Sequence, residues 1–387
     1  MMSSNGSSAT AIDVRLFLCG DVMTGRGVDQ ILPHPSAPQL YESHMHSAVG
    51  YVRLAERASG AVQRGHGFVY PWGDALALLD EWEPAARIVN LETAVTTSER
   101  AQPGKGIHYR MHPANIGCLT GAGIDCAMLA NNHVLDWGRE GLIETMSALR
   151  DAQVRWAGAG HDAGEAAAPA TLDLPTGGRL LVFALAASSS GVPPEWSATA
   201  TRCGVNFIDA VSTSSAERVA QAIGLQRRHG DLVVVSIHWG GNWGFAIPQE
   251  HRDFARVLIE SGAVDLVYGH SSHHVLGIEV IRGKLVLYGC GDFINDYEGI
   301  VGYESFGPNL ALMYFPVLRA PSGELADLAL VPLRRRRLRL EHADGGDVAW
   351  LARTLQREGE RLGTGVHTDA NGVIRLAWAA RASCASR

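Results

Sequence analysis

The sequence predicts a protein of the α/β class, with a mainly parallel sheet and helices outside it. Short apolar runs alternate with longer amphipathic segments along most of the chain. The runs are continuous in hydrophobicity, as in strands that are buried on both faces. Because strand and helix follow one another repeatedly, the strands are expected to be parallel. The clearest apolar runs are 15–21, 87–92, 126–133, 232–238, 264–270 and 285–292.

Helices are expected between these runs. Segment 140–153 places Leu142, Met146 and Leu149 at positions i, i+4 and i+7, which puts them on one helix face. Segment 248–262 opens with Pro and closes with Gly, the usual residues at the two ends of a helix. The further expected elements are helices at 214–229 and 348–362 and a last strand at 373–378.

The chain is expected to form a single domain over residues 13–387, after a disordered N-terminus at 1–12. Of its 387 residues, 46% are apolar and 19% are charged, which is typical of a globular protein with a sizeable core. No linker rich in Pro, Gly or Ser divides it. Segment 34–72 is rich in His, Pro, Ser and Tyr and is expected to be an insertion. It either lies beside the strand ends and shapes a pocket or is a plain surface excursion.

Charge and cysteine content exclude several classes of protein. The net charge of −7 predicts no general affinity for nucleic acid, and the run 334–337 of four arginines is expected to be a solvated strand edge. The six cysteines form no CxxC pair, as in a reducing compartment. Neither a secretory signal nor an apolar run of about 18 residues is present. We therefore expect a cytoplasmic protein without a membrane anchor; the oligomeric state stays open.

Each of the apolar runs ends in a side chain that can bind a metal or exchange a proton. In open α/β sheets, ligands bind outside the carboxyl ends of the strands. These side chains are therefore expected to meet at one place, although they are far apart along the chain. The shared set is Asp21, Glu92, Asn132, His238, His270 and His273.

This set of side chains predicts a metal site. Two carboxylates, an amide oxygen and three imidazoles suit Mn²⁺, Fe²⁺ or Zn²⁺ better than a thiolate-preferring metal. They exceed what one tetrahedral zinc needs. They suit two divalent ions about 3.5–4 Å apart with a bridging carboxylate. Such a pair activates water to attack a phosphoester or a related polar bond. Which of His270, His273 and the adjacent His274 are ligands stays open.

Motifs around these residues resemble those of a known family. In order they are GDVMTGR (20–26), NLETAVT (90–96), LANNHVLDWG (129–138), HWG (238–240), GHSSHHVLGIEV (269–280) and YGCGDFIND (288–296). The combination resembles the CapA family of poly-γ-glutamate capsule biosynthesis proteins, a branch of the calcineurin-like metallophosphatases. The likeness covers residues from about 14 to about 300.

The resemblance implies a four-layer sandwich of two mixed β-sheets flanked by helices. It also implies roles for individual residues. Asp21 takes the place of a first-metal carboxylate, Glu92 that of the bridging carboxylate and Asn132 that of a second-metal ligand. His133 resembles the histidine that protonates the leaving group, with Asp136 orienting it. The remaining imidazoles come from His238 and from the cluster His270, His273 and His274.

The sequence departs from the family pattern at several positions. The usual Asp-x-His of metallophosphatases is Asp21-Val22-Met23 here, which removes one ligand. The usual GHHPH has Ser271 and Ser272 at its third and fourth positions. Asn242 stands where Glu is usual after HWG-x, and Asp292 stands where GNF has Asn; for Asp292 a role as a supporting hydrogen-bond acceptor is one interpretation. The capsule proteins carry a membrane anchor, and none is expected here.

The substrate is expected to be a small molecule or a peptide with anionic groups. Arg26 and Arg110 are the best candidates to bind such groups, although each is equally suited to a structural ion pair. Two other functions remain open. One is an amide-processing enzyme that acts on a γ-glutamyl or tailored peptide in a biosynthetic pathway. The other is a non-catalytic, metal-stabilised partner of a polymer synthase.

Overall fold

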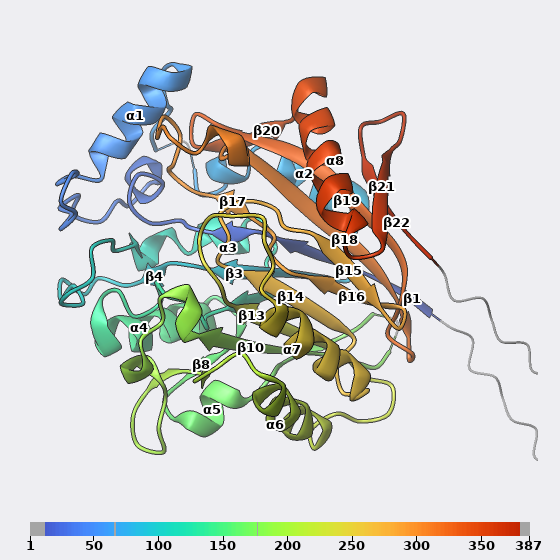
Figure 1. Cartoon of the computed structure of the whole chain (residues 1–387). Coiled ribbons are helices and arrows are strands. Elements are labelled where there is room, and N and C mark those ends of the chain that lie inside the picture. The colour runs from blue at the N-terminus through green and yellow to red at the C-terminus, as the bar shows by residue number, and fades with distance from the viewer. Residues whose placement is uncertain (1–11, 66, 176, 380–387) are drawn as a thin grey trace, which may run out of the picture.

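The computed structural model describes residues 12–65, 67–175 and 177–379 and shows a mixed α/β fold (Figure 1). The N-terminal segment that the sequence predicts to be disordered lies outside these residues up to position 11. Its last residue, Ile12, is instead the first residue of strand β1 (Ile12–Cys19). The predicted disorder is therefore wrong for Ile12.

The larger sheet has a parallel part and an antiparallel part. Besides β1 its strands are β2 (Asp21–Val22), β3 (Ala86–Leu91), β6 (Cys126–Met128), β7 (Arg155–Ala157), β17 (Asp292–Ile294), β18 (Leu310–Ala320), β19 (Glu324–Arg336), β20 (Arg339–His342), β21 (Thr364–Thr368) and β22 (Ile374–Trp378). The main order is β17-β2-β3-β1-β18-β19-β22-β21. Strand β1 pairs parallel with β3 and antiparallel with β18. The expected mainly parallel arrangement is therefore wrong for the C-terminal half of this sheet.

The smaller sheet is parallel at its centre. Its strands are β9 (Ala170–Asp173), β10 (Arg179–Ala187), β12 (Phe207–Ile208), β13 (Leu232–His238), β14 (Leu266–His270), β15 (Ile278–Ile281) and β16 (Lys284–Leu287). The order β12-β10-β13-β14-β16-β15 keeps β10, β13, β14 and β16 parallel. Two short pairs complete the strands: β4 (Ala94–Val95) with β5 (Arg110–Met111), and β8 (Ala159–Gly160) with β11 (Gly204–Val205).

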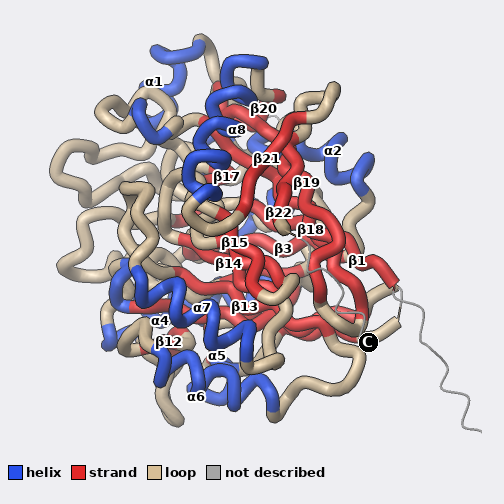
Figure 2. Tube along the Cα trace, turned by 45° about the vertical axis from the view of Figure 1, so that its right-hand side comes forward, coloured by secondary structure: helices blue, strands red, loops and turns tan. Residues whose placement is uncertain are grey.

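The four expected helices are confirmed, with ends that differ by a few residues. They are α4 (Gly138–Asp151), α6 (Thr213–Gly224), α7 (Gln249–Glu260) and α8 (Gly345–Glu360); the others are α1 (Val49–Ser59), α2 (Ala75–Trp82), α3 (Gly117–Thr120) and α5 (Ala163–Ala167). Helices α6 and α7 lie together beside the smaller sheet (Figure 2). None of the helices within the described residues has the length and hydrophobicity that a membrane crossing requires.

Strands of the smaller sheet bury apolar side chains on both faces. Leu180, Val182 and Val234 belong to a core that also contains side chains of β1 and β18. Their neighbours Leu181 and Val233 point the other way, into a second core with α6 and α7. This two-sided burial explains why the runs read as continuously apolar in the sequence.

The arginine run is not a solvated edge. Strand β19 pairs with β18, β20 and β22, so it lies inside the sheet. Arg335 is only 3% exposed, and its guanidinium donates hydrogen bonds to the backbone carbonyls of Asp292 and Pro308. Side chains alternate across a strand, so Arg335 points inward while Arg336 is exposed. Because the four residues of the run are identical, the sequence does not show which arginines point inward and which point outward.

The 34–72 insertion is tied to the sheet by a buried ion pair. Arg26 donates through Nη1 to Glu42 at 2.9 Å and through Nε and Nη2 to Asp296 at 3.1 and 2.5 Å. Its guanidinium also lies 3.8 Å from the centre of the Tyr51 ring, which belongs to α1. The insertion therefore contacts the loop that follows β17. In Figure 1, α1 of the insertion and β17 lie on the same upper side of the molecule.

This ion pair gives a testable prediction for stability. Replacing Arg26 with Met leaves two buried carboxylates without a cation, so the free energy of unfolding should fall by about 3–5 kcal/mol. Urea unfolding measures the change. The control is Arg100→Met, because Arg100 and Glu140 are 3.1 Å apart but 80% and 65% exposed. The control should change stability by less than about 1 kcal/mol. Equal effects of both variants would contradict the role given to Arg26.

Candidate metal centre

The polar side chains at the ends of strands from both sheets lie close together. Strand β2 carries Asp21, and Asp292 of β17 pairs with it directly, while Glu92 follows the end of β3. In the smaller sheet, His238 and His270 are paired residues at the ends of β13 and β14. All five side chains are buried. The prediction that distant segments bring their ligands together thus agrees with the geometry.

Asp21 belongs to two groups of possible metal ligands. One group is Asp21, Glu92 and His238, and the other is Asp21, His273 and Asp292. Within each group, one ligand atom of every residue lies within 4.8 Å of the others. The carboxylate that the two groups share is therefore that of Asp21, whereas the family resemblance gives the bridging place to Glu92.

Asp21 is held in its charged form by its neighbours. Its Oδ1 lies 2.7 Å from Nδ1 of His270 and accepts a hydrogen bond from the Asn90 amide at 2.8 Å. Burial opposes the charge, but the hydrogen bond and charge of His270 prevail and keep the pKa of Asp21 below its ordinary value. Burial and the nearby Asp21 raise the pKa of Glu92 well above its usual range. A cation between the two carboxylates would favour the charged form of both.

Two histidines at the strand ends each have a buried ring nitrogen without a hydrogen-bond partner, which could bind a cation. These atoms are Nδ1 of His238 and Nε2 of His270. Nε2 of His238 lies 3.2 Å from Oδ1 of Asn132 and 3.8 Å from Oε1 of Glu92. Burial lowers the pKa of His238 to about 3, so the ring is neutral near pH 7 and keeps a lone pair. Neutral imidazole and oxygen donors together suit divalent Mn, Fe or Zn.

The second group rests on Asp292, a residue that the sequence did not predict as a ligand. Its Oδ1 lies 2.8 Å from Nδ1 of His273, and its Oδ2 accepts a hydrogen bond from Asn295 at 2.6 Å. The sequence signal was present, because GD follows an apolar run at 291–292 as it does at 20–21. What the sequence did not show is that β17 pairs with β2 and sets the two aspartates side by side.

His133 and Asp136 form a pair at the edge of the first group. Nδ1 of His133 lies 2.7 Å from Oδ2 of Asp136, and Nε2 lies 3.8 Å from Oε1 of Glu92. Burial lowers the pKa of His133 to about 4, although Asp136 acts in the opposite direction. Lys105 is a neighbour that the sequence did not assign to the site: its Nζ lies 3.1 Å from His133 Nδ1 and pairs with Asp136. Lys105 is one of only two lysines in the chain.

His274 does not fit the predicted ligand set. Its Nδ1 lies 3.1 Å from the carbonyl of Val275, and its Nε2 accepts a hydrogen bond from the Gly244 N–H at 3.1 Å. Both nitrogens are therefore engaged within the protein, and no lone pair is left for a cation. We remove His274 from the ligand set. His273 belongs to one of the two ligand groups, whereas His270 belongs to neither but contacts Asp21 through Nδ1 and keeps an unpartnered Nε2.

The two arginines predicted to bind substrate are engaged by the protein. The donors of Arg26 are directed at Asp296 and Glu42, as described above. Arg110 donates to the backbone carbonyls of Ser98 and Ala37, and its guanidinium lies 4.0 Å from the centre of a Trp137 ring. Both positions agree with the structural alternative that the sequence left open.

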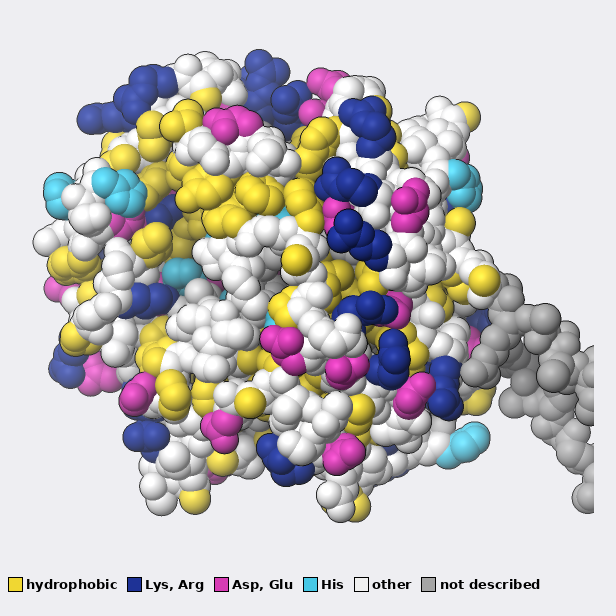
Figure 3. Space-filling model, viewed as in Figure 1, with side chains coloured by type: hydrophobic (Ala, Val, Ile, Leu, Met, Phe, Trp, Pro, Cys, Tyr) yellow, Lys and Arg dark blue, Asp and Glu magenta, His cyan; other side chains and the backbone are white. Residues whose placement is uncertain are grey.

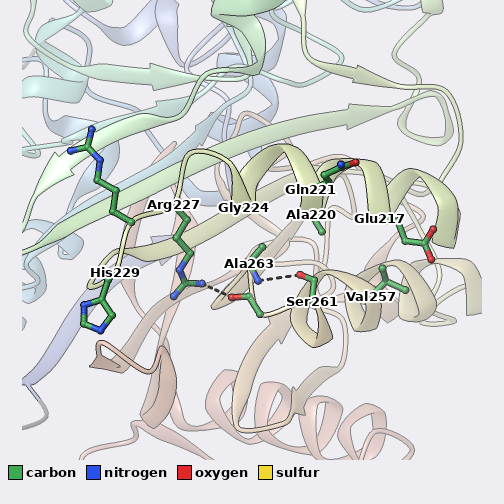
Figure 4. A pocket seen from close by; sticks show the side chains of 11 residues that line it. Glu217, Ala220, Gln221, Gly224, Arg227, His229, Val257, Ser261 and Ala263 are labelled. Atoms are coloured by element: carbon green, nitrogen blue, oxygen red, sulfur yellow. Dashed lines mark hydrogen bonds between the residues drawn. The ribbon is translucent and has the colours of Figure 1, made fainter. Parts of the chain in front are cut away.

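A cavity of about 540 Å³ lies away from the two ligand groups, between the ends of α6 and α7 (Figure 4). Arg227, His229 and Ser261 are among its lining residues. The guanidinium of Arg227 donates to the Gly262 carbonyl at 2.8 Å and pairs with Asp265 at 2.9 Å. None of the residues that line this cavity belongs to either ligand group, so its size does not make it the functional site.

Comparison with known proteins gives a consistent result. The family described as bacterial capsule synthesis protein PGA_cap matches residues 15–297. Two proteins of Mycobacterium tuberculosis strains, each named probable polyglutamine synthesis accessory protein, are 44% identical over 368 residues. That alignment covers 95% of this chain and 97% of each relative. The PGA biosynthesis protein CapA of Bacillus subtilis is 24% identical over 72% of this chain and 62% of its own length.

The ligand assignment predicts how single histidines affect metal binding. His270→Gln should weaken Mn²⁺ binding at least about 10- to 100-fold, because an unpartnered nitrogen in the site is lost. His274→Gln should leave the affinity within about threefold, because neither nitrogen of His274 is free. Isothermal titration of the metal-free protein measures both. A larger loss in His274→Gln than in His270→Gln would overturn the assignment.

Proposed function

The chain belongs to the CapA (PGA_cap) family of bacterial capsule synthesis proteins, and from this premise we propose that it is a metal-dependent hydrolase. The proposed site holds two divalent cations at the strand ends and cleaves a phosphoester or a related polar bond. The observation that carries the proposal is the carboxylate of Asp21, which is common to two groups of ligand atoms.

The residues present fit two cations. One group offers the donors of Asp21, Glu92 and His238, and the other offers those of Asp21, His273 and Asp292. Asn132 contacts His238 at 3.2 Å, and His270 contacts Asp21 at 2.7 Å. Asp292 adds an oxygen donor to the second group. Bound Mn, Fe or Zn ions would lower the pKa of water and polarise the bond to be cleaved.

The chain's own residues would handle the protons. Asp136 fixes the ring of His133 through Nδ1, so that Nε2 faces Glu92 and the site. In this proposal Nε2 of the neutral ring accepts a proton from the attacking water and passes it to the leaving oxygen. Lys105 places a positive charge beside the same carboxylate and holds the backbone carbonyl of Asn132. It thereby orients the loop that carries both Asn132 and His133.

We extend the proposal to the layering of the fold. The family relation implies two mixed sheets packed together with helices on both outer sides. Two features support this layering: apolar side chains of both sheets share one core, and α6 and α7 pack on the opposite face of the smaller sheet.

A non-catalytic role is the second candidate. The M. tuberculosis relatives are named accessory proteins of polyglutamine synthesis, which favours a role beside a synthase. The engagement of Arg26 and Arg110 by the protein favours it as well, because neither is free to bind an anionic substrate. Cleavage of an amide, as in a γ-glutamyl peptide, is a variant of the enzymatic proposal that uses the same cations.

Removal of the cations with a chelator tests whether the protein is an enzyme or a non-catalytic accessory protein. We expect a chelator to abolish hydrolysis and Mn²⁺ to restore it in a panel of phosphomonoesters, phosphodiesters and γ-glutamyl peptides. Glu92→Gln should reduce turnover by at least about 100-fold, because it removes a carboxylate from the ligand set. Two bound metal equivalents without turnover on any substrate would contradict the hydrolase and support the accessory role.

Proton delivery by His133 predicts a separate effect. His133→Gln should lower kcat by about 10²- to 10⁴-fold while the bound metal stays at its wild-type level. His161→Gln is the matched control, since the His161 side chain is 52% exposed and pairs only with Glu165. Its kcat should be unchanged. A fall in metal content that parallels the fall in kcat would show that His133 acts on the metals instead.

A further inference from the structure

A cavity of about 210 Å³ opens directly beside the second ligand group. His273 lines this cavity and is also a member of the group with Asp21 and Asp292. A molecule in the cavity would therefore lie next to a cation held by that group. The wall also includes Arg26, Tyr51, Ile107, Trp243, Tyr297 and Tyr303.

Aromatic rings form much of the wall. The rings of Trp243 and Tyr303 are stacked, with centroids 4.1 Å apart and planes at 15°. Trp243 also lies 5.3 Å from the ring of His273, and His273 lies 5.2 Å from Tyr297. A continuous set of rings thus leads from the metal position to the surface.

The mouth of the cavity exposes apolar surface. Tyr303 is 36% exposed, Ile107 is 38% exposed and Val301, two residues before Tyr303, is 79% exposed. Figure 3 shows hydrophobic side chains gathered in the upper half of one face of the molecule. Exposed apolar patches of this kind often mark binding sites.

The polar groups in the wall are engaged elsewhere. The donors of Arg26 are directed at Glu42 and Asp296, and the Tyr51 hydroxyl donates to Glu42. The Tyr297 hydroxyl lies 3.2 Å from that of Tyr109. Because one guanidinium faces two carboxylates, the wall carries no surplus positive charge. The side chain of Asn242 is exposed at the mouth, and the exposed His44 has its Nε2 3.6 Å from Oε2 of Glu42.

We propose that this cavity is a subsite for an uncharged aromatic ring of the substrate, attached close to the bond that is cleaved. The inference rests on the proposed function, since the reacting group must reach the cation at His273 and Asp292. A flat ring can contact the stacked pair of Trp243 and Tyr303 or meet Tyr297 edge-on, and such aromatic contacts add to the burial of apolar area. A second anionic group would find no free cationic side chain in this wall.

Binding of two phosphonates of similar size tests the subsite. With Mn²⁺-loaded protein, benzylphosphonate should bind about fivefold more tightly than cyclohexylmethylphosphonate by isothermal titration. Trp243→Ala should abolish this preference, whereas Trp243→Phe should keep it because a ring remains. Trp378→Ala is the control, since Trp378 lies on β22 and does not line the cavity. Equal affinities in the wild type would overturn the proposal, as would a preference that Trp243→Ala retains.

Measurements of turnover show which of the two proposals is wrong, the ring subsite or the hydrolase activity. Benzyl and cyclohexylmethyl phosphate both release primary alcohols, so their comparison tests recognition of the ring. Faster kcat/KM for the benzyl ester supports both proposals. Turnover of both esters at the same kcat/KM overturns the ring subsite alone. Ring-selective phosphonate binding without turnover of any phosphoester or γ-glutamyl peptide overturns the hydrolase and leaves the subsite standing.

Discussion

Three buried carboxylates, those of Asp21, Glu92 and Asp292, lie together at the strand ends, and the site depends on how their charge is balanced. Isolated carboxylates are costly to bury unless they are paired or bind a cation. Among the basic groups nearby, Lys105 pairs with Asp136, and Arg335 donates to the backbone carbonyl of Asp292. Beside the carboxylates lie imidazole rings that each have one nitrogen without a hydrogen-bond partner. Divalent cations would satisfy the carboxylates and these nitrogens at once.

The fold holds these groups in place from several directions. Parallel pairing of β2 with β3 and β17 fixes Asp21, Glu92 and Asp292, and pairing of β13 with β14 fixes the two histidines opposite. Behind the site, Tyr268 donates its hydroxyl hydrogen to the carbonyl of Cys19, which joins the smaller sheet to β1. The ligands thus stand on strands, and their positions depend little on flexible loops.

Much of the site was predictable because parallel strands place their carboxyl ends together. Five predicted ligands each follow an apolar run. Because ligands bind at the carboxyl ends of parallel strands, all five were expected at the same edge: Asp21, Glu92, Asn132, His238 and His270.

The rest of the site depends on pairing between distant segments. Asp292 became a ligand candidate only through the β17–β2 pair, and Lys105 only through the return of a loop to Asp136. His274 and the two arginines have suitable chemistry, but their donors and acceptors are used by nearby backbone and carboxylate groups. Strand β18 and most of β19 were not predicted because no motif marks them, and only the arginine run at the end of β19 was interpreted as strand.

The proposed site differs from the family expectation in the carboxylate placed between the two proposed cations. Asp21 takes that place in the proposal because it belongs to both groups of ligand atoms, and Asp292 belongs to the second group. Anomalous diffraction from Mn²⁺-soaked crystals at the manganese edge tests this most directly. The account predicts two peaks on either side of the Asp21 carboxylate, one near Glu92 and His238 and the other near His273 and Asp292. Peaks bridged by Glu92 without Asp21, or no peak within coordinating distance of Asp21, would contradict it.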